Sequence, residues 1–300
     1  MSLSAVTGRI LFALGLSSLM VIHARRKKSL SPNGAATAFL LGMITFSAPL
    51  WVFSVVLLAF FLASSKLTKF KAVRKRQLEA DYEQSSERSA IQVIANGLMG
   101  GLAVAAFQYL YYSNTSNEHT SSLEKCLQLN NDRWTKILLW AYVGHYGCCA
   151  GDTWASELGI LNKSWPILIT KLKKVPPGTN GGVSVLGFIA SLAGGAFVGA
   201  ATSLTLYLEQ RSCFGFAYEY IILGSMAGMI GSLVDSILGA TVQESLYSED
   251  KKKIVNDKSS AHVNVISGIP LLDNHQVNML SSFIITAASA YAAYKLYPIQ

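Results

Sequence analysis

Long apolar blocks separated by short charged segments dominate this sequence and restrict what it can fold into. The blocks cover residues 5–23, 34–65, 90–112, 134–151, 181–208, 217–241 and 277–297. About 20 apolar residues in a helix cross a hydrocarbon core roughly 30 Å thick. Only 14% of the chain is charged, against roughly 25% in soluble domains. The sequence therefore predicts an all-α transmembrane helix bundle, formed by residues 1–300 as a single integral membrane domain.

The second block, 34–65, is too long for one comfortable span, and Pro49 interrupts its middle. Proline removes a backbone donor and bends or ends a helix. The block is therefore either two short crossings or a re-entrant hairpin, and both return the chain to the side it left. The bundle is expected to have seven or eight spans.

The basic residues indicate how the bundle is oriented. Of the 25 Lys and Arg residues, 19 fall in the segments 25–33, 66–89, 152–180 and 242–276. By the positive-inside rule these segments are cytosolic, and both termini are lumenal or extracellular. We expect an endoplasmic reticulum or other endomembrane location. The net charge of +8 does not indicate a nucleic-acid binder, because the basic residues do not cluster with aromatic residues. It reflects the basic segments that orient the bundle in the membrane.

The run Gly151–Gly159 ends an apolar block with unusually polar residues. Ionisable groups at membrane depth are costly, and they usually face a polar cavity or each other. On a helix Asp152 and Ser156 share a face, with Thr153 beside them and Glu157 one position further. Carboxylates and hydroxyls around one turn are a suitable place for Mg²⁺, which favours oxygen ligands.

Two other segments are candidates for binding phosphate. Lys66 and Lys69 lie among small hydroxyl residues. They are either lysines of a membrane anchor that snorkel to the interface or ammonium groups that bind a phosphate. The run Val175–Gly182 leads directly into an apolar block, and it is either a simple turn or a loop whose backbone N–H groups bind an anion. The residues at issue in that loop are Gly178, Thr179, Asn180, Gly181 and Gly182.

A further polar pair of segments lies towards the C-terminus. Asp235, Gly239 and Gln243 fall along one helical face inside a block, while Asp273, Asn274 and Asn278 can form a polar corner before the last block. A carboxylate alone in apolar surroundings is expensive. Asp152 and Asp235 are therefore expected to share one cavity with a metal ion.

These motifs resemble the transmembrane protein 19 family. The runs that carry the resemblance are GDTWASELG, VPPGTNGGVSVLG, GSLVDSILGATVQ and DNHQVN, with SSKLTK and QVIANG in support. The wider family includes the chloroplast phytyl-phosphate kinase of tocopherol synthesis and archaeal relatives. The resemblance implies transfer of a phosphoryl group from a nucleoside triphosphate, expected to be CTP, to an isoprenoid monophosphate.

On this basis Asp152 and Asp235 are expected to hold Mg²⁺, and Asp273 and Asn278 to complete or orient its shell. Lys66, Lys69 and the Gly178–Gly182 loop are expected to hold phosphates, with Ser156, Glu157, Gln243 and Asn274 in support. The expected partners are membrane lipid and an isoprenoid phosphate. The alternative is a non-catalytic transporter or lipid-handling protein, because helix-end anion sites and acids near mid-membrane are also transporter features.

Overall fold

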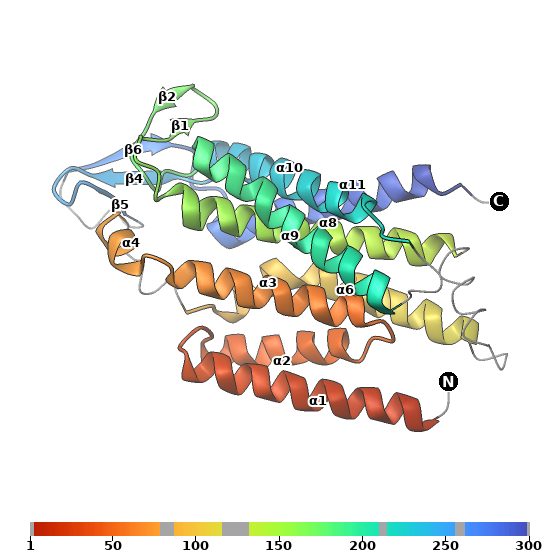
Figure 1. Ribbon diagram of the computed structural model, residues 1–300. Helices are drawn as coiled ribbons and strands as arrows, with labels where there is room; N and C mark the ends of the chain where they lie inside the picture. The colour runs from red at the N-terminus through yellow and green to blue at the C-terminus, as the bar shows by residue number, and fades with distance from the viewer. Residues whose placement is uncertain (1–2, 79–86, 116–131, 210–214, 256–261, 299–300) are drawn as a thin grey trace.

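The computed structural model describes residues 3–78, 87–115, 132–209, 215–255 and 262–298. Residues 79–86 and 256–261, which belong to two of the predicted cytosolic segments, lie outside the described part. Long helices make up most of it, and they form one elongated bundle (Figure 1). They are α1 (Leu3–Arg26), α2 (Pro32–Phe46), α3 (Trp51–Lys69), α6 (Ala90–Thr115), α8 (Arg133–Gly159), α9 (Val185–Glu209), α10 (Glu219–Val242) and α11 (Asn274–Leu296), with a short helix α4 (Ala72–Leu78).

Five helices in the described ranges are long and apolar enough to cross a membrane, namely α1, α3, α6, α9 and α10. Helix α8 is more polar because it lies at the centre of the bundle, where α3, α6, α9, α10 and α11 all pack against it. Its residues from Leu139 to Gly151 are buried without interruption. Outer helices show the opposite pattern, since α1 exposes large apolar side chains such as Leu11 and Leu19 to its surroundings. Protein rather than lipid therefore surrounds the helix that carries Asp152.

The connections between helices are unequal at the two ends of the bundle (Figure 1). Every described β-strand, helix α4 and the C-terminal ends of α1, α3, α8 and α10 lie at one end, on the left in Figure 1, and the first turn of α1 and the last turn of α11 lie at the other. The described parts of the four basic segments lie at the strand-bearing end. Which side of a membrane this end faces stays a prediction.

The long second block folds into two antiparallel helices, α2 and α3, joined by the turn at residues 47–50 that contains Pro49. Helix α2 begins at Pro32, and the Ser31 side chain accepts a hydrogen bond from the Gly34 N–H, which is a normal helix start. The first residue of α3, Trp51, donates its backbone N–H to the Glu209 carboxylate at 3.0 Å. With 15 residues, α2 is about 22 Å long, which is shorter than the ~30 Å hydrocarbon core.

Two small antiparallel sheets lie mostly in the predicted cytosolic segments 152–180 and 242–276, with strand β3 at the start of the apolar block 181–208. The first joins β1 (Ile167–Leu168), β2 (Lys173–Lys174) and β3 (Gly182–Val183), with β1 in the middle. The second joins β4 (Ser245–Ser248), β5 (Lys253–Val255) and β6 (Val263–Ser267), with β4 in the middle. The two sheets are connected, because the Asn180 N–H donates to Ser245 Oγ at 3.0 Å. The prediction of an all-α fold therefore holds for the bundle, but not for these connections.

Glycines allow the helices beside α8 to approach very closely. A Cβ atom on Gly151 would lie 2.4 Å from the Gly228 Cα, and one on Gly195 would lie 2.0 Å from the Gly224 carbonyl oxygen. Small residues are the usual means of helix packing in membranes, where lipid gives no hydrophobic drive between helices. Here they draw the ends of α8, α9 and α10 together, and this brings Asp152 and Asp235 into the same region.

Candidate functional site

A polar cavity of about 390 Å³ opens at the strand-bearing end of the bundle. Its walls are the last turns of α8 and α10, the first turns of α6, α9 and α11, and the glycine-rich loop before α9. Three helices thus begin at this cavity. The positive ends of their helix dipoles favour anions in the cavity, although Ser184 and Asp273 cap α9 and α11 and already accept some of the N–H groups there.

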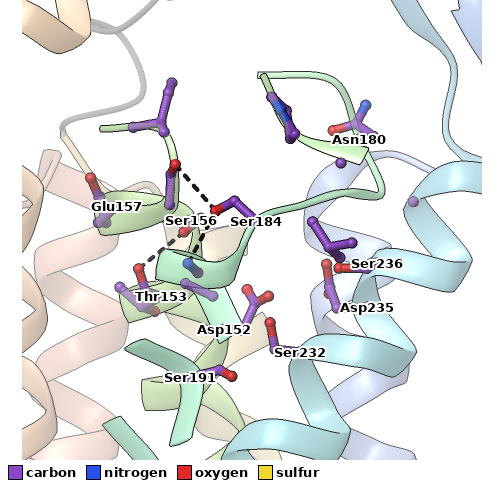
Figure 2. Close-up of a pocket in the computed structure, with 18 of the residues that line it drawn as sticks. Asp152, Thr153, Ser156, Glu157, Asn180, Ser184, Ser191, Ser232, Asp235 and Ser236 are labelled. Atoms are coloured by element: carbon purple, nitrogen blue, oxygen red, sulfur yellow. Dashed lines mark hydrogen bonds between the residues drawn. The ribbon is translucent and has the colours of Figure 1, made fainter. Parts of the chain in front are cut away.

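Two carboxylates from different helices face this cavity (Figure 2). Asp235 on α10 accepts a hydrogen bond from Ser281 Oγ at 3.1 Å. The Asn278 side-chain amide, in the orientation that directs its nitrogen towards acceptors, donates to the same oxygen at 3.2 Å. Asp152 on α8 accepts no hydrogen bond from any residue that the structure describes, and it is close enough to Asp235 for the two charges to repel. An unpaired carboxylate beside a second one favours a bound cation.

Hydroxyl groups surround these carboxylates. Figure 2 shows Thr153, Ser156, Ser184, Ser191, Ser232 and Ser236 around the same hollow. Ser156, predicted as a supporting residue, donates its Oγ to the Thr153 carbonyl oxygen at 3.0 Å. Ser184 caps α9, because its Oγ accepts the Gly187 N–H at 3.1 Å. The hydroxyls provide a wall of small donors and acceptors without added charge.

A buried ion pair forms the wall between α4 and α8. The Lys75 side chain is only 1% exposed, and its Nζ lies 2.5 Å from Glu157 Oε2 and 2.8 Å from the Leu67 carbonyl oxygen. Glu157 lines the cavity as predicted for a supporting residue, but its charge is matched by Lys75. It is therefore a wall residue, and among the described residues that line the cavity it leaves Asp152 and Asp235 as the two carboxylates without a basic partner.

The glycine-rich loop lines the cavity from Pro177 to Ser184, so Gly178, Thr179, Asn180, Gly181 and Gly182 all reach it. Three of its N–H groups are already used inside the protein: those of Thr179, Asn180 and Gly182 donate to Pro176 O, Ser245 Oγ and Thr179 O. Gly178 and Gly181 have positive φ angles of 86° and 77°, and a Cβ on Gly181 would lie 2.5 Å from the Ser236 carbonyl oxygen. The loop is thus tightly fitted against α10, and it offers fewer N–H groups to an anion than its sequence suggests.

Other predicted residues divide between the cavity and the surface. Gln243, Asn274 and Asn278 line the cavity. Asp273 does not: it caps α11 through hydrogen bonds from the His275 and Gln276 N–H groups, at 2.8 and 2.9 Å. Its carboxylate is therefore used by the helix end.

Lys66 and Lys69 are exposed and lie outside the cavity lining. The chain turns at Lys71, whose φ is 51°, and α4 then folds back so that Lys75 enters the wall. Arg88, just before α6, supplies the second basic group of the cavity. Burial lowers the pKa of the Arg88 guanidinium, and the nearby Glu157 carboxylate opposes this change.

Gln92 and Asn96 also line the cavity, although sequence reasoning gave them no role beyond the QVIANG motif. They lie one turn apart on α6, and that spacing inside an apolar helix was a usable signal. The Asn96 Nδ2 donates to the Gln92 carbonyl oxygen at 2.9 Å. Both side chains thus belong to the wall that carries Arg88.

The residues present fit a magnesium ion better than a metal that needs a full set of protein ligands. No group of three or more His, Cys, Asp or Glu side chains converges among the described residues. Mg²⁺ at phosphoryl-transfer sites is usually held by one or two carboxylates, together with water and substrate phosphates. Asp152 and Asp235 would supply those carboxylates, and the ion would neutralise phosphate charge.

The bundle and its cavity define a multi-pass integral membrane protein with a polar site at one end, walled by acidic and basic groups. The comparison with known families agrees, because the family described as integral membrane protein DUF92 matches residues 15–286. The chain belongs to this family. That membership is consistent with the resemblance found in the sequence.

Several curated proteins are similar along most of the chain. Protein PGR of Arabidopsis thaliana is 39% identical over 292 residues, which covers 94% of this chain and 97% of the relative. Protein VTE6, chloroplastic, of Arabidopsis thaliana is 28% identical and covers 88% of this chain and 68% of its own length. An uncharacterized membrane protein of Methanocaldococcus jannaschii is 24% identical, covering 87% and 90%. No solved structure matches the chain significantly.

Proposed function

We propose that this protein is a membrane lipid phosphotransferase, which transfers the γ-phosphoryl group of CTP to an isoprenoid monophosphate and gives a prenyl diphosphate and CDP. The observation that carries the proposal is the pair Asp152 and Asp235 in one cavity, with Asp152 unpaired among the described residues. Phosphoryl transfer depends mainly on positioning and charge neutralisation. Two carboxylates for a magnesium ion and basic groups for phosphates meet that need.

Each wall of the cavity would have its own task. Asp152 and Asp235 would hold Mg²⁺, with Asp235 kept in place by Ser281 and Asn278. The first turns of α6, α9 and α11 and the Arg88 guanidinium would attract phosphates. Lys75 would act through Glu157, by keeping α4 against α8. We propose these residues in place of Lys66 and Lys69, which lie outside the cavity.

The acceptor group makes few chemical demands on the protein. The oxygens of an alkyl monophosphate are already negatively charged near neutral pH, so no strong general base is needed to activate them. The choice of CTP and of an isoprenoid acceptor is supported by the resemblance to a family that includes the phytyl-phosphate kinase.

The proposed site also implies a topology. We propose that α1, α2, α3, α6, α8, α9, α10 and α11 all cross an endomembrane, with the cavity open to the cytosol, where nucleotides are available, and both termini on the lumenal side. The short helix α2 would cross where the bilayer is locally thinner or its ends reach the interface. Support comes from the distribution of basic residues, because 19 of the 25 Lys and Arg lie in the four segments that the positive-inside rule places in the cytosol.

The direct test uses purified protein, Mg²⁺ and CTP labelled in the γ-phosphate, with a panel of prenyl monophosphates and the corresponding free prenols. Labelled prenyl diphosphate, formed only from the monophosphates and only with Mg²⁺, is the expected result. Replacing CTP by ATP or GTP in the same assay identifies the donor. Movement of a prenyl phosphate across vesicle membranes without any labelled product would instead support the transporter alternative.

A further inference from the structure

A second cavity lies beside the polar one, between α1, α2, α3 and α6. It has a volume of about 70 Å³, and its lining is almost entirely apolar. Met20 and Val21 line it from α1, Leu41 from α2, and Leu57, Phe60 and Phe61 from α3. The space therefore suits a hydrocarbon group and not a nucleotide.

The two cavities share one wall. Arg88, just before α6, and Gln92 and Asn96, in its first two turns, line both of them. The apolar cavity therefore lies against the polar cavity, and the Arg88 cation belongs to the wall between them. A molecule that passes between these side chains would have its charged head in the polar cavity and its apolar tail in the apolar one.

The Arg88 side chain is available for such a head group. Its guanidinium lies 5.8 Å above the Phe61 ring and donates no hydrogen bond to any residue within the described ranges. Its backbone is fixed, because the Arg88 N–H donates to Ser29 O and the Arg88 carbonyl oxygen accepts from Ser31 N–H, both at 3.0 Å. A partly buried guanidinium held in this way is well placed for a phosphate, which it can bind with two N–H groups.

We propose that the apolar cavity binds the part of the acceptor's chain nearest its phosphate, and that Arg88 binds that phosphate. This inference rests on the proposed function and adds to it the place and orientation of the lipid. The phosphate would lie between Arg88 and the two aspartates, so that the transferred group meets it in the polar cavity. The cavity holds only a few carbon atoms, so a longer chain would continue into the surrounding lipid.

Substitutions on α2 can test the position of the chain. Ala38 lines the apolar cavity and is partly buried, so Ala38→Phe fills the space. Ala36 lies two residues earlier on the same helix and is exposed, so Ala36→Phe makes the same chemical change outside the cavity. The probe is farnesyl monophosphate with a photoreactive diazirine in the isoprene unit next to the phosphate, and labelled peptides are mapped by mass spectrometry.

We expect labelling within residues 17–61 and 92–96, competition by unlabelled farnesyl monophosphate, and at least a tenfold loss of labelling in Ala38→Phe but not in Ala36→Phe. Ala38→Leu, which fills less of the space, should give an intermediate loss if Ala38→Phe does not fold. Labelling confined to other helices, or unchanged by Ala38→Phe, overturns the proposal. Labelling needs no turnover, so a missing kinase activity would contradict the proposed function while this result stood.

Arg88 is tested with a second probe, the photoreactive farnesol that lacks the phosphate. Arg88→Gln should weaken capture of the phosphorylated probe about tenfold or more and leave capture of the alcohol unchanged, while Arg88→Lys should lose less. An equal effect on both probes would mean that Arg88 acts only on the shape of the cavity. No effect on either would also contradict its role as the phosphate ligand.

Discussion

Asp152 on α8 and Asp235 on α10 line the same cavity, although they are far apart in the sequence. Gly151 and Gly228 lie at the crossing of the two helices, and there is no room for a Cβ atom on Gly151. The close approach of α8 and α10 therefore depends on Gly151, next to Asp152, and on Gly228, two turns before Asp235. The glycine contact that packs α8 against α10 therefore also sets the positions of the two aspartates in the cavity.

The helix crossing gives the first prediction. In Gly228→Ala the new Cβ would lie 2.5 Å from the Ser191 carbonyl oxygen, so α9 and α10 must separate. We expect a loss of about 1–3 kcal/mol in stability and a drop in activity. Gly15→Ala is the matched control, because a Cβ at this helical position of α1 meets nothing within 4 Å. Thermal unfolding in detergent measures both, and equal stability of the two variants would contradict the packing account.

The second prediction concerns the buried pair Lys75 and Glu157. Lys75 is only 1% exposed whereas Glu157 faces the cavity, so Glu157→Gln leaves a buried charge without its partner and should cost about 3–5 kcal/mol, and Glu157→Gln combined with Lys75→Met should recover much of this loss. The exposed pair Arg25 and Glu87, with both side chains 41% exposed, should contribute less than about 1 kcal/mol. Unfolding of the single and double variants measures the coupling. Additive effects at Lys75 and Glu157 would show that the pair does not hold α4 to α8.

The third prediction concerns topology. Lys173 on β2 is exposed at the cavity end of the bundle, and Tyr218 is 67% exposed at the opposite end. In a cysteine-free background, Lys173→Cys should react with an impermeant thiol reagent only when the reagent has access to the cytosol, for example after selective permeabilisation of the plasma membrane. Tyr218→Cys should not react with reagent in the cytosol and should react only when the reagent reaches the lumenal side. Labelling of both positions from the same side would contradict a bundle that crosses the membrane with the cavity towards the cytosol.

The sequence predicts the membrane bundle and both key aspartates for a simple physical reason. Uncharged blocks of spanning length have few other folds, and an acid inside such a block needs a polar partner. It does not show which of the basic residues in 66–89 reaches the cavity, because they look alike. That choice depends on the turn at Lys71, which brings Lys75 into the wall and leaves Lys66 and Lys69 outside.

Asp273 and the small sheets show two other limits. The run from Asp273 to Gln276 is equally the signature of a capping box, and the structure uses it in that way. Strands of two residues, such as β1 and β2, are too short to show alternating apolar residues. Their pairing comes instead from the contacts of the glycine-rich loop with α10 and β4.

The measurement that tests the central claim most directly compares two Asp→Asn substitutions on the same helix. Asp152 faces the cavity, whereas Asp132 caps the other end of α8 by accepting the Trp134 N–H at 3.1 Å. If Asp152 holds Mg²⁺, Asp152→Asn should lower formation of prenyl diphosphate by at least the roughly 10–100-fold that loss of an outer-shell partner of a metal ligand causes. Thermal stability should be unchanged or higher, because an uncompensated acid is removed. Asp132→Asn should keep near-normal activity and lose some stability. Near-normal activity in Asp152→Asn would contradict the account.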